Sequence, residues 1–298
     1  MKNLIFLNDY FQKEYGHKVY KLSLNGGMTC PNRDGTKGTG GCIFCSSGGS
    51  GEFAGDKNLS IREQIEGQKN LLKNKIKNFE SIKFISYFQA FTNTYAPVDK
   101  LETLYRESLA PSDVVGLSIA TRPDVLPDEV LELLKKLKKE TGKEIWVELG
   151  LQTIHEKTAE YIRRGYRLEC FNKAVEELHK RDIKVIVHII FGLPGETEKD
   201  MLATVSHVGK MSVFGVKFQN LQILKGTDLA KEYVKGLVKP ITFDEYGKIL
   251  IKAVSILPEG TVIHRITGDP PKSLIIEPEW CTDKRLVMDR LKKMLYNS

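Results

Sequence analysis

The sequence predicts an α/β protein: a partial (β/α)6 barrel of the TIM type, followed by a small C-terminal α/β extension. Six β-branched segments alternate with amphipathic helical segments, which indicates a parallel sheet built from right-handed βαβ units. Polar and glycine-rich residues repeatedly follow the strands, and barrels of this kind carry their chemistry on loops at the C-terminal strand ends. An open doubly wound sheet fits the same alternation, so the alternation alone does not separate the two folds.

The barrel elements follow one another with short connections. The predicted strands are 18–24, 82–88, 114–120, 144–151, 183–191 and 215–223. The predicted helices are 58–78, 97–109, 127–140, 155–181 with a break near Gly165, and 197–211. In the second helix Val98, Leu101 and Leu104 repeat at spacings of three, and the third begins with Pro127-Asp128-Glu129, a favourable first turn. Residues 1–240 are therefore expected to form the core barrel.

Residues 241–298 are expected to form the extension, with a helix near 242–255, a strand at 261–266 and a last helix at 283–296. His264-Arg265 in this strand precedes Thr267-Gly268-Asp269. Either this segment closes the barrel mouth over a substrate, or it forms an exposed hairpin. Cys281 has no partner in the sequence pattern.

The composition is that of a globular protein, with 41% hydrophobic and 28% charged residues among 298. No apolar run approaches the roughly 18 residues that cross a bilayer. The N-terminal MKNLIFLNDYF lacks the small-residue cleavage site of a signal peptide. We therefore expect a cytoplasmic protein with no membrane partner. In that compartment clustered cysteines bind metal more readily than they form disulfides.

The net charge is +7, from 45 Lys and Arg against 38 Asp and Glu. This excess permits a polyanionic partner without requiring one. Basic residues gather at 135–139 and 284–295. These runs are either solvated helix faces or part of a nucleic-acid-facing surface.

Three of the five cysteines follow the first predicted strand, at Cys30, Cys42 and Cys45. Cys42 and Cys45 can hold one metal centre together, and the glycine-rich arc of eleven residues lets Cys30 approach them. A structural zinc site needs four ligands, and no second close pair supplies the fourth. Three thiolates on a four-iron cluster leave one iron open to another ligand.

This pattern resembles the radical S-adenosylmethionine (SAM) superfamily. Phe44 directly before the last cysteine is typical of it, although the first interval is longer than the superfamily's commonest spacing. The motifs TCPNRDGTKGTGGCIFC, ATRPD, RRGY, FGLPGE and HRITGD resemble more narrowly the bacterial YhcC/YtqA-like proteins of the branch that contains the catalytic subunit of Elongator. The resemblance spans nearly the whole chain. The chain has no room for the acetyltransferase domain of that subunit.

The resemblance implies a mechanism and its cofactors. A [4Fe-4S] cluster held by Cys30, Cys42 and Cys45 binds SAM at its open iron, and one electron cleaves SAM to a 5′-deoxyadenosyl radical that abstracts a substrate hydrogen. The electron donor is a protein such as flavodoxin or ferredoxin. The branch implies tRNA as substrate, with the wobble uridine's 5-carboxymethylaminomethyl side chain processed towards aminomethyl. Radical chemistry on a small metabolite and a non-catalytic, zinc-stapled RNA-binding module are the alternatives.

The resemblance also places SAM near the end of the second predicted strand. Superfamily members often have a Gly-Gly-Glu segment there, whereas this chain has 88–95 (FQAFTNTY), which keeps polar acceptors but lacks the glycines. Gln89 and Thr92 are therefore the expected SAM neighbours. An ordinary polar turn is the alternative.

In the fourth predicted strand, Glu148, Gly150 and Gln152 alternate and so share one face. Polar groups on the inner face of a barrel suit ribose and carboxylate. Gln152 is the leading candidate to contact SAM, with Glu148 beside it. His188 in the next strand is expected to line the barrel or its core.

Three further residues complete the expected cofactor site. Arg122 either grips a carboxylate or phosphate in two-point fashion or forms a salt bridge with Asp124. Arg164 of RRGY is a candidate for the SAM carboxylate. Gly192 in FGLPGE resembles the family's strand-5 motif, which packs against adenine, and permits close approach of the backbone.

Overall fold

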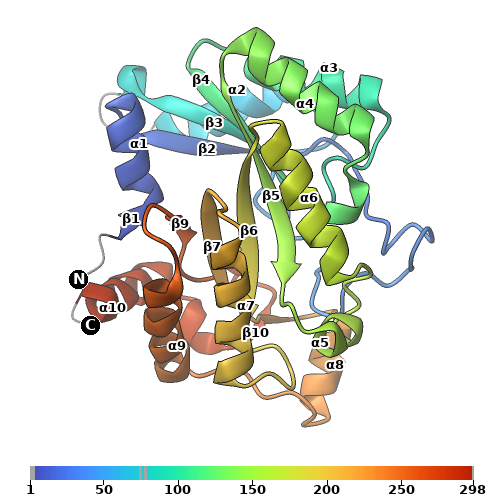
Figure 1. The fold of residues 1–298 in the computed structure, drawn as a ribbon, viewed down its shortest axis with the longest axis vertical. Helices are drawn as coiled ribbons and strands as arrows, with labels where there is room; N and C mark the ends of the chain where they lie inside the picture. The colour runs from blue at the N-terminus through green and yellow to red at the C-terminus, as the bar shows by residue number, and fades with distance from the viewer. Residues whose placement is uncertain (1–3, 74–75, 77–78, 297–298) are drawn as a thin grey trace.

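The structure, a computed structural model, describes residues 4–73, 76 and 79–296. Its centre is an eight-stranded, wholly parallel sheet in the order β1-β9-β7-β6-β5-β4-β3-β2. The sheet is curled, with helices on its outer side (Figure 1). This confirms the α/β fold of the partial-barrel type rather than the open doubly wound sheet.

The six predicted strands are present with shifted ends. They are β2 (Val19–Leu24), β3 (Lys83–Phe88), β4 (Val114–Thr121), β5 (Glu144–Gln152), β6 (Lys184–Phe191) and β7 (Gly215–Asn220). The last one ends at Asn220, and Ile223–Leu224 forms a separate strand β8 that pairs antiparallel with β10 (Ile275–Glu277).

Two more strands extend the sheet beyond the six. β9 (Val262–Arg265), predicted within the extension, lies parallel to β7, and the short β1 (Ile5–Phe6) lies beside β9. The main sheet therefore continues from residues 1–240 into residues 241–298. The pairing follows from apolar character, since Val262 and Ile263 are buried opposite Gly215 and Val216.

The helices follow the predicted periodicity. They are α1 (Leu7–Tyr15), α2 (Ile61–Lys73), α3 (Val98–Leu109), α4 (Asp128–Thr141), α5 (Glu156–Tyr161), α6 (Leu168–Lys180), α7 (Glu198–Lys210), α8 (Asp228–Val234), α9 (Phe243–Ile256) and α10 (Lys284–Tyr296). The break near Gly165 separates α5 from α6, as expected. The last residues of the predicted helix 58–78 lie outside the described residues. The described elements α1, α8, β1 and β10 were not predicted.

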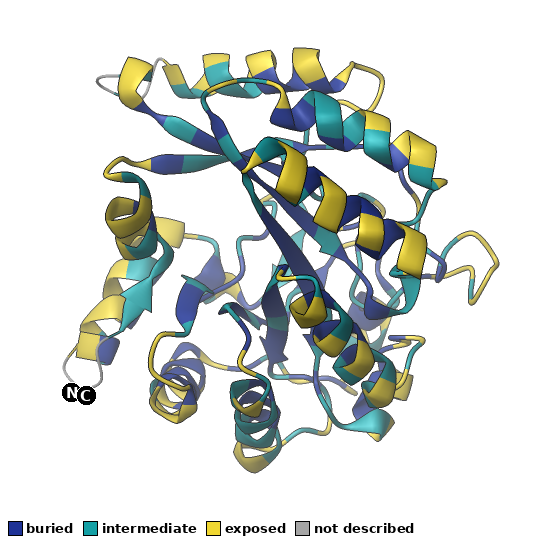
Figure 2. Ribbon diagram, turned by 45° about the horizontal axis from the view of Figure 1, so that its top comes forward, coloured by how far each residue is buried: buried dark blue, intermediate teal, exposed yellow. Residues whose placement is uncertain are grey.

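The helices turn their polar faces outward and bury their apolar faces against the sheet (Figure 2). A second apolar cluster fills the inside of the barrel at the N-terminal ends of the strands. There the ring of Phe11 from α1 stacks on Trp146 of β5 at 5.8 Å, and Ile85 and Ile186 complete the layer. We call this cluster the floor of the barrel. None of the described helices has the length and apolar character that a membrane span requires.

Candidate active site

Above the floor, the barrel holds a cavity of about 180 Å³ between the C-terminal strand ends and the loop of residues 25–60, called here the cysteine loop. Six of the seven residues predicted to bind the cofactor line this cavity together with the three cysteines: Gln89, Thr92, Arg122, Glu148, Gln152 and Arg164, with Cys30, Cys42 and Cys45. The fold therefore brings these predicted residues together.

Gly192 does not line this cavity. It lies at another hollow, formed by the β6–α7 turn and the segment before α9, where a Cβ at Gly192 would come within 3.0 Å of Ile241. Its φ of 85° is in the left-handed region, so glycine is needed for the turn and for the close approach of Ile241.

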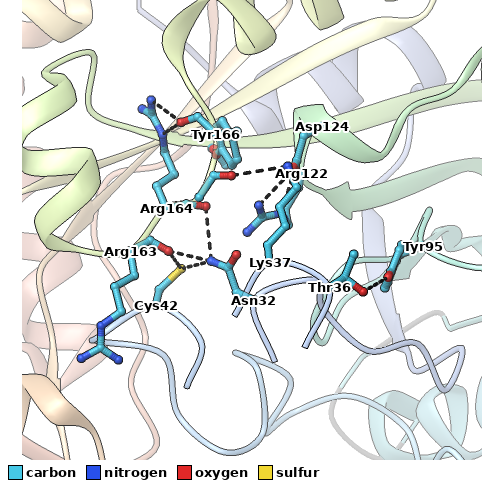
Figure 3. A network of polar contacts seen from close by, with 12 residues as sticks. Asn32, Thr36, Lys37, Cys42, Tyr95, Arg122, Asp124, Arg163, Arg164 and Tyr166 are labelled. Atoms are coloured by element: carbon cyan, nitrogen blue, oxygen red, sulfur yellow. Dashed lines mark hydrogen bonds and ion pairs between the residues drawn. The ribbon is translucent and has the colours of Figure 1, made fainter. Parts of the chain in front are cut away.

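The cysteine loop folds into tight turns that aim its thiols at the cavity. Cys45 N–H donates to the Cys42 carbonyl at 3.0 Å, and Arg33 N–H donates to the Cys30 carbonyl at 2.8 Å. Asn32 ties the loop to the RRGY segment, because its Nδ2 donates to the Arg163 carbonyl at 2.6 Å and lies 3.6 Å from Cys42 Sγ (Figure 3). Sequence reasoning did not select Asn32.

Burial raises the pKa of the Cys42 thiol to about 12, and burial likewise raises the pKa of Cys45. A thiolate is the form that binds metal, so a bound cation must offset this desolvation. Within the described ranges, no three His, Cys, Asp or Glu side chains are gathered as ligands of a single metal ion. A donor set of three sulfurs around one cavity suits a cluster with an open site better than a closed zinc site with four ligands.

The loop after β3 packs directly on the cysteine loop. Ala90 and Phe91 have φ values of 77° and 58°, the left-handed conformation that favours glycine. Phe91 N–H donates to the Gly49 carbonyl at 2.9 Å, and a Cβ at Gly49 would fall 2.4 Å from the Phe91 ring. The backbone shape that glycines would adopt is therefore held here by contacts with the cysteine loop. Thr92, which follows, is buried and donates its N–H to the Thr29 carbonyl.

Arg122 forms the salt bridge that was one of its two predicted roles. Its Nε and Nη2 each donate to Asp124 at 2.9 Å, and Lys37 reaches the same carboxylate at 2.5 Å (Figure 3). Burial favours the neutral form of Asp124, but Arg122 and Lys37 outweigh it and lower its pKa. The guanidinium also lies 5.0 Å from the ring centre of Tyr166, which with Arg122 forms one wall of the cavity.

The Arg164 guanidinium donates hydrogen bonds to backbone carbonyls. Its Nη1 donates to the carbonyls of Leu151 and Thr153, and its Nε and Nη2 donate to the Tyr166 carbonyl. The side chain is fully enclosed, with 1% of the residue exposed. Arg164 therefore shapes the end of β5, because the two carbonyls that its Nη1 holds, those of Leu151 and Thr153, flank Gln152.

Gln152 combines a left-handed backbone conformation with a buried side-chain acceptor that has no partner in the described part of the chain. Its φ is 67°, and its Oε1 is buried in the cavity wall without a hydrogen-bond partner in the described part of the chain. A Cβ at Gly150 would lie 2.9 Å from Gln152 Nε2, so glycine makes room for the side chain. An orphaned buried acceptor costs free energy unless a donor arrives. A ligand with hydroxyl or ammonium donors would satisfy it.

A charged cluster lies at the deep end of the cavity, where Glu148 and His188 line it. The fully buried Glu148 carboxylate accepts from Lys21 Nζ at 2.6 Å, from Ser118 Oγ at 2.6 Å and from Lys217 Nζ, and lies 2.8 Å from His188 Nε2. Burial opposes the charge on Glu148, but the two lysines hold its pKa well below the usual range. Burial lowers the pKa of His188 to about 4 and that of Lys217 to about 7.

The two lysines were missed by sequence reasoning. The alternation in β2 could have found Lys21, because Leu22 and Leu24 are buried on one face of the strand and leave Lys21 on the other. Lys217 in β7 follows the same pattern.

Comparisons with known proteins show which family the chain resembles. A family model described as the radical SAM superfamily matches residues 32–208, and one described as a radical SAM C-terminal domain matches residues 213–297. The uncharacterized protein YtqA of Bacillus subtilis is 45% identical over 291 residues, which cover 98% of this chain and 89% of YtqA. The tRNA uridine(34) acetyltransferase of Methanocaldococcus jannaschii is 31% identical over 166 residues, 55% of this chain and 30% of that protein.

Among solved structures, archaeal Methanocaldococcus infernus Elp3 with an N-terminal deletion has a TM-score of 0.70 at 19% identity. The match covers 93% of this chain and 63% of that one, and it shows a shared fold. Members of the superfamily use a [4Fe-4S] cluster and SAM, the pair that the thiols and the orphaned Gln152 acceptor fit. By its family matches over most of its length and its close relatives, this chain belongs to the radical SAM superfamily.

Proposed function

We propose that this radical SAM enzyme modifies tRNA at the wobble uridine and processes its 5-carboxymethylaminomethyl side chain towards aminomethyl. The observation that supports tRNA as the substrate is the similarity, over 55% of the chain, to a tRNA uridine(34) acetyltransferase. The match covers 30% of that protein, so acetyl transfer is not part of the proposal.

In this proposal Cys30, Cys42 and Cys45 hold the cluster, whose bound form together with SAM supplies hydrogen-atom abstraction. The protein's own groups orient the ligands and exclude water. Gln152 Oε1 accepts a hydrogen bond from SAM, and Arg164 positions Gln152 by fixing the carbonyls beside it.

Gln89 and Thr92 line the SAM side of the cavity, and Arg122 offers the ligand only those N–H groups that Asp124 leaves free. Glu148 pairs with Lys21 and Lys217 and holds their side chains in place. Gly192 supports the turn after β6 from outside the cavity. We further propose a cytoplasmic enzyme that receives its electron from a flavodoxin or ferredoxin.

The experiment is deletion of the gene, followed by mass spectrometry of the anticodon nucleosides of total tRNA. We expect the carboxymethylaminomethyl nucleoside to accumulate and its aminomethyl product to fall. Re-expression of the wild-type chain should restore the profile, whereas a Cys42→Ala chain should not. An unchanged nucleoside profile in the deletion strain rules the proposal out, and leaves the alternative of a small metabolite as substrate.

A further inference from the structure

A second cavity, of about 330 Å³, lies beside the cofactor cavity. We call it the side chamber. Its walls include Lys21, Lys217, Gln222, His264 and Arg265. Tyr87, Gln89 and Ser50 line both cavities, so a molecule in the side chamber lies against the same residues as the bound cofactor.

Three side chains that carry basic nitrogen atoms occupy neighbouring positions on the inner face of the sheet. His188 of β6 pairs in register with Lys217 of β7, and Lys217 pairs with Arg265 of β9. Residues at one level of neighbouring parallel strands point to the same face, with the strands roughly 4.8 Å apart. An irregularity in the β7–β9 pairing sets Arg265, rather than His264, beside Lys217. Two cationic side chains are thereby held next to each other inside the barrel.

The chamber has more cations than carboxylates to balance them. Glu148 is shared between Lys21 and Lys217. At the rim Asp269 is paired with Lys284, and Glu52 is bound to Ser46. Arg265 is half-buried, and within the described residues its guanidinium forms no ion pair or hydrogen bond. A guanidinium kept among other cations without a counter-ion is costly unless an anion joins it.

Unsatisfied donors point to the same conclusion. Gln222 Nε2 is buried without a partner in the described part of the chain, and so are both ring nitrogens of His264, which packs edge-on against Trp146 and Phe214. An amide N–H and a guanidinium only donate, whereas burial keeps the His264 pKa low and its neutral ring has one donor and one acceptor nitrogen. The donors without a partner are therefore those of Gln222 and Arg265 and one of His264. The missing group is therefore an acceptor with negative charge. A carboxylate matches the fork of an arginine in two-point fashion.

We propose that the side chamber binds a carboxylate of the substrate, with Arg265 as the two-point contact and Lys217 beside it. The inference rests on the proposed function in one respect: the wobble-uridine side chain to be processed ends in a carboxylate. Arg265 and Lys217 would then hold that side chain next to the residues shared with the cofactor cavity. They would also reject a side chain that has already lost its carboxylate.

The test uses the full chain with its cluster reconstituted and SAM present. Two nucleosides, 5-carboxymethylaminomethyluridine and 5-aminomethyluridine, are titrated into it by calorimetry. Neither carries a phosphate, so a site that recognises phosphate shows no preference between them. We expect the carboxylate nucleoside to bind about 10- to 100-fold more tightly, as a charge-assisted two-point contact provides.

Variants assign the preference to Arg265. Arg265→Gln should lose it, and Arg265→Lys should keep part of it, because a lysine retains the charge without the fork. Arg106→Gln is the matched control: Arg106 pairs with Glu102 and Glu140 on the outer helices, and its loss should leave the preference intact. Visible absorption of the cluster checks that each variant folds.

The outcomes separate the two proposals. Equal binding of both nucleosides by the wild type overturns the carboxylate site, whatever the state of the variants. So does an Arg265→Gln chain that folds and keeps the preference. If the wild type prefers the carboxylate nucleoside but gene deletion leaves the anticodon nucleosides unchanged, the carboxylate site stands and the tRNA function fails.

Discussion

Glu148 is a fully buried carboxylate with two lysines, a serine and a neutral histidine around it. Both lysine side chains are largely shielded from water, since the exposed fractions of the Lys21 and Lys217 side chains are 18% and 5%. Taking one charge away from such a cluster leaves the others without compensation. Glu148 is thus a positioning residue for the deep end of the site.

Replacing Glu148 with Gln should lower the free energy of unfolding by roughly 3–5 kcal/mol, the usual cost of breaking a buried ion pair. Urea denaturation of the purified chain measures it. The control is Glu176→Gln, an exposed glutamate on α6, for which we expect a change within about 0.5 kcal/mol. A Glu148→Gln loss no larger than that of the control would show that the lysines do not depend on this carboxylate.

At the scale of elements, the cysteine loop is held from two sides. The loop after β3 packs on Gly49, and the RRGY segment between α5 and α6 packs on Asn32. Gly165 is central to the second contact. Its φ is 81°, and a Cβ there would lie 2.6 Å from Asn32 Oδ1.

Gly165→Ala should therefore displace Asn32 and reduce the iron bound per chain after anaerobic reconstitution. Gly142→Ala is the control, because Gly142 has a φ of 66° but has nothing within 4 Å of its added Cβ. In both variants an alanine has to adopt the left-handed backbone conformation, which costs about 1–2 kcal/mol and lowers the Tm. Equal iron content in the two variants would show that the RRGY segment does not support the loop.

The thiols themselves give a direct test of the loop. Changing Cys30, Cys42 or Cys45 to Ala should remove the broad visible absorption of the cluster and the formation of 5′-deoxyadenosine from SAM. Cys170→Ala should keep both, because Cys170 lines a separate groove. A brown, SAM-cleaving Cys42→Ala chain would contradict the assignment of that ligand.

At the scale of the whole molecule, the main sheet contains strands from both sides of the boundary predicted at residue 240. β7 has β6 on one side and β9 on the other, and β9 also holds β1 in place. Arg265 and His264 enter the barrel only because β9 belongs to this sheet. The segment that was expected either to close the mouth or to form an exposed hairpin forms part of the barrel wall.

A chain of residues 1–240 should accordingly be poorly stable or aggregated, because it leaves the edge of β7 unpaired. Size-exclusion chromatography and thermal unfolding, with the full chain as control, measure this. A monomeric 1–240 fragment with the Tm of the full chain would show that residues 241–298 are an independent appendage.

The barrel and most of its helices could be predicted because strand and helix periodicities are local properties of the sequence. Membership of β9 in the main sheet could not, since pairing between Val262 and Gly215 depends on long-range packing. β1, with two residues, is too short to show a period.

The predicted cofactor residues form one cavity except Gly192, and their roles as ligands stay predictions. Lys21 and Lys217 escaped prediction because a charged residue in a strand is usually turned to water. The sequence alone does not show that both strand faces are covered. Arg164 could be placed near the site, but its use on carbonyls depends on the turn at Gln152.

The packing of Phe11 on Trp146 closes the barrel at the N-terminal ends of its strands. The described side chains of the floor are closely packed, with 0–7% of each of its buried members exposed. Dioxygen and solvent oxidants therefore have to reach the thiols from the side of the loops. The lifetime of a cluster in air is then governed by the cysteine loop and the loop after β3, and the floor takes no part in it.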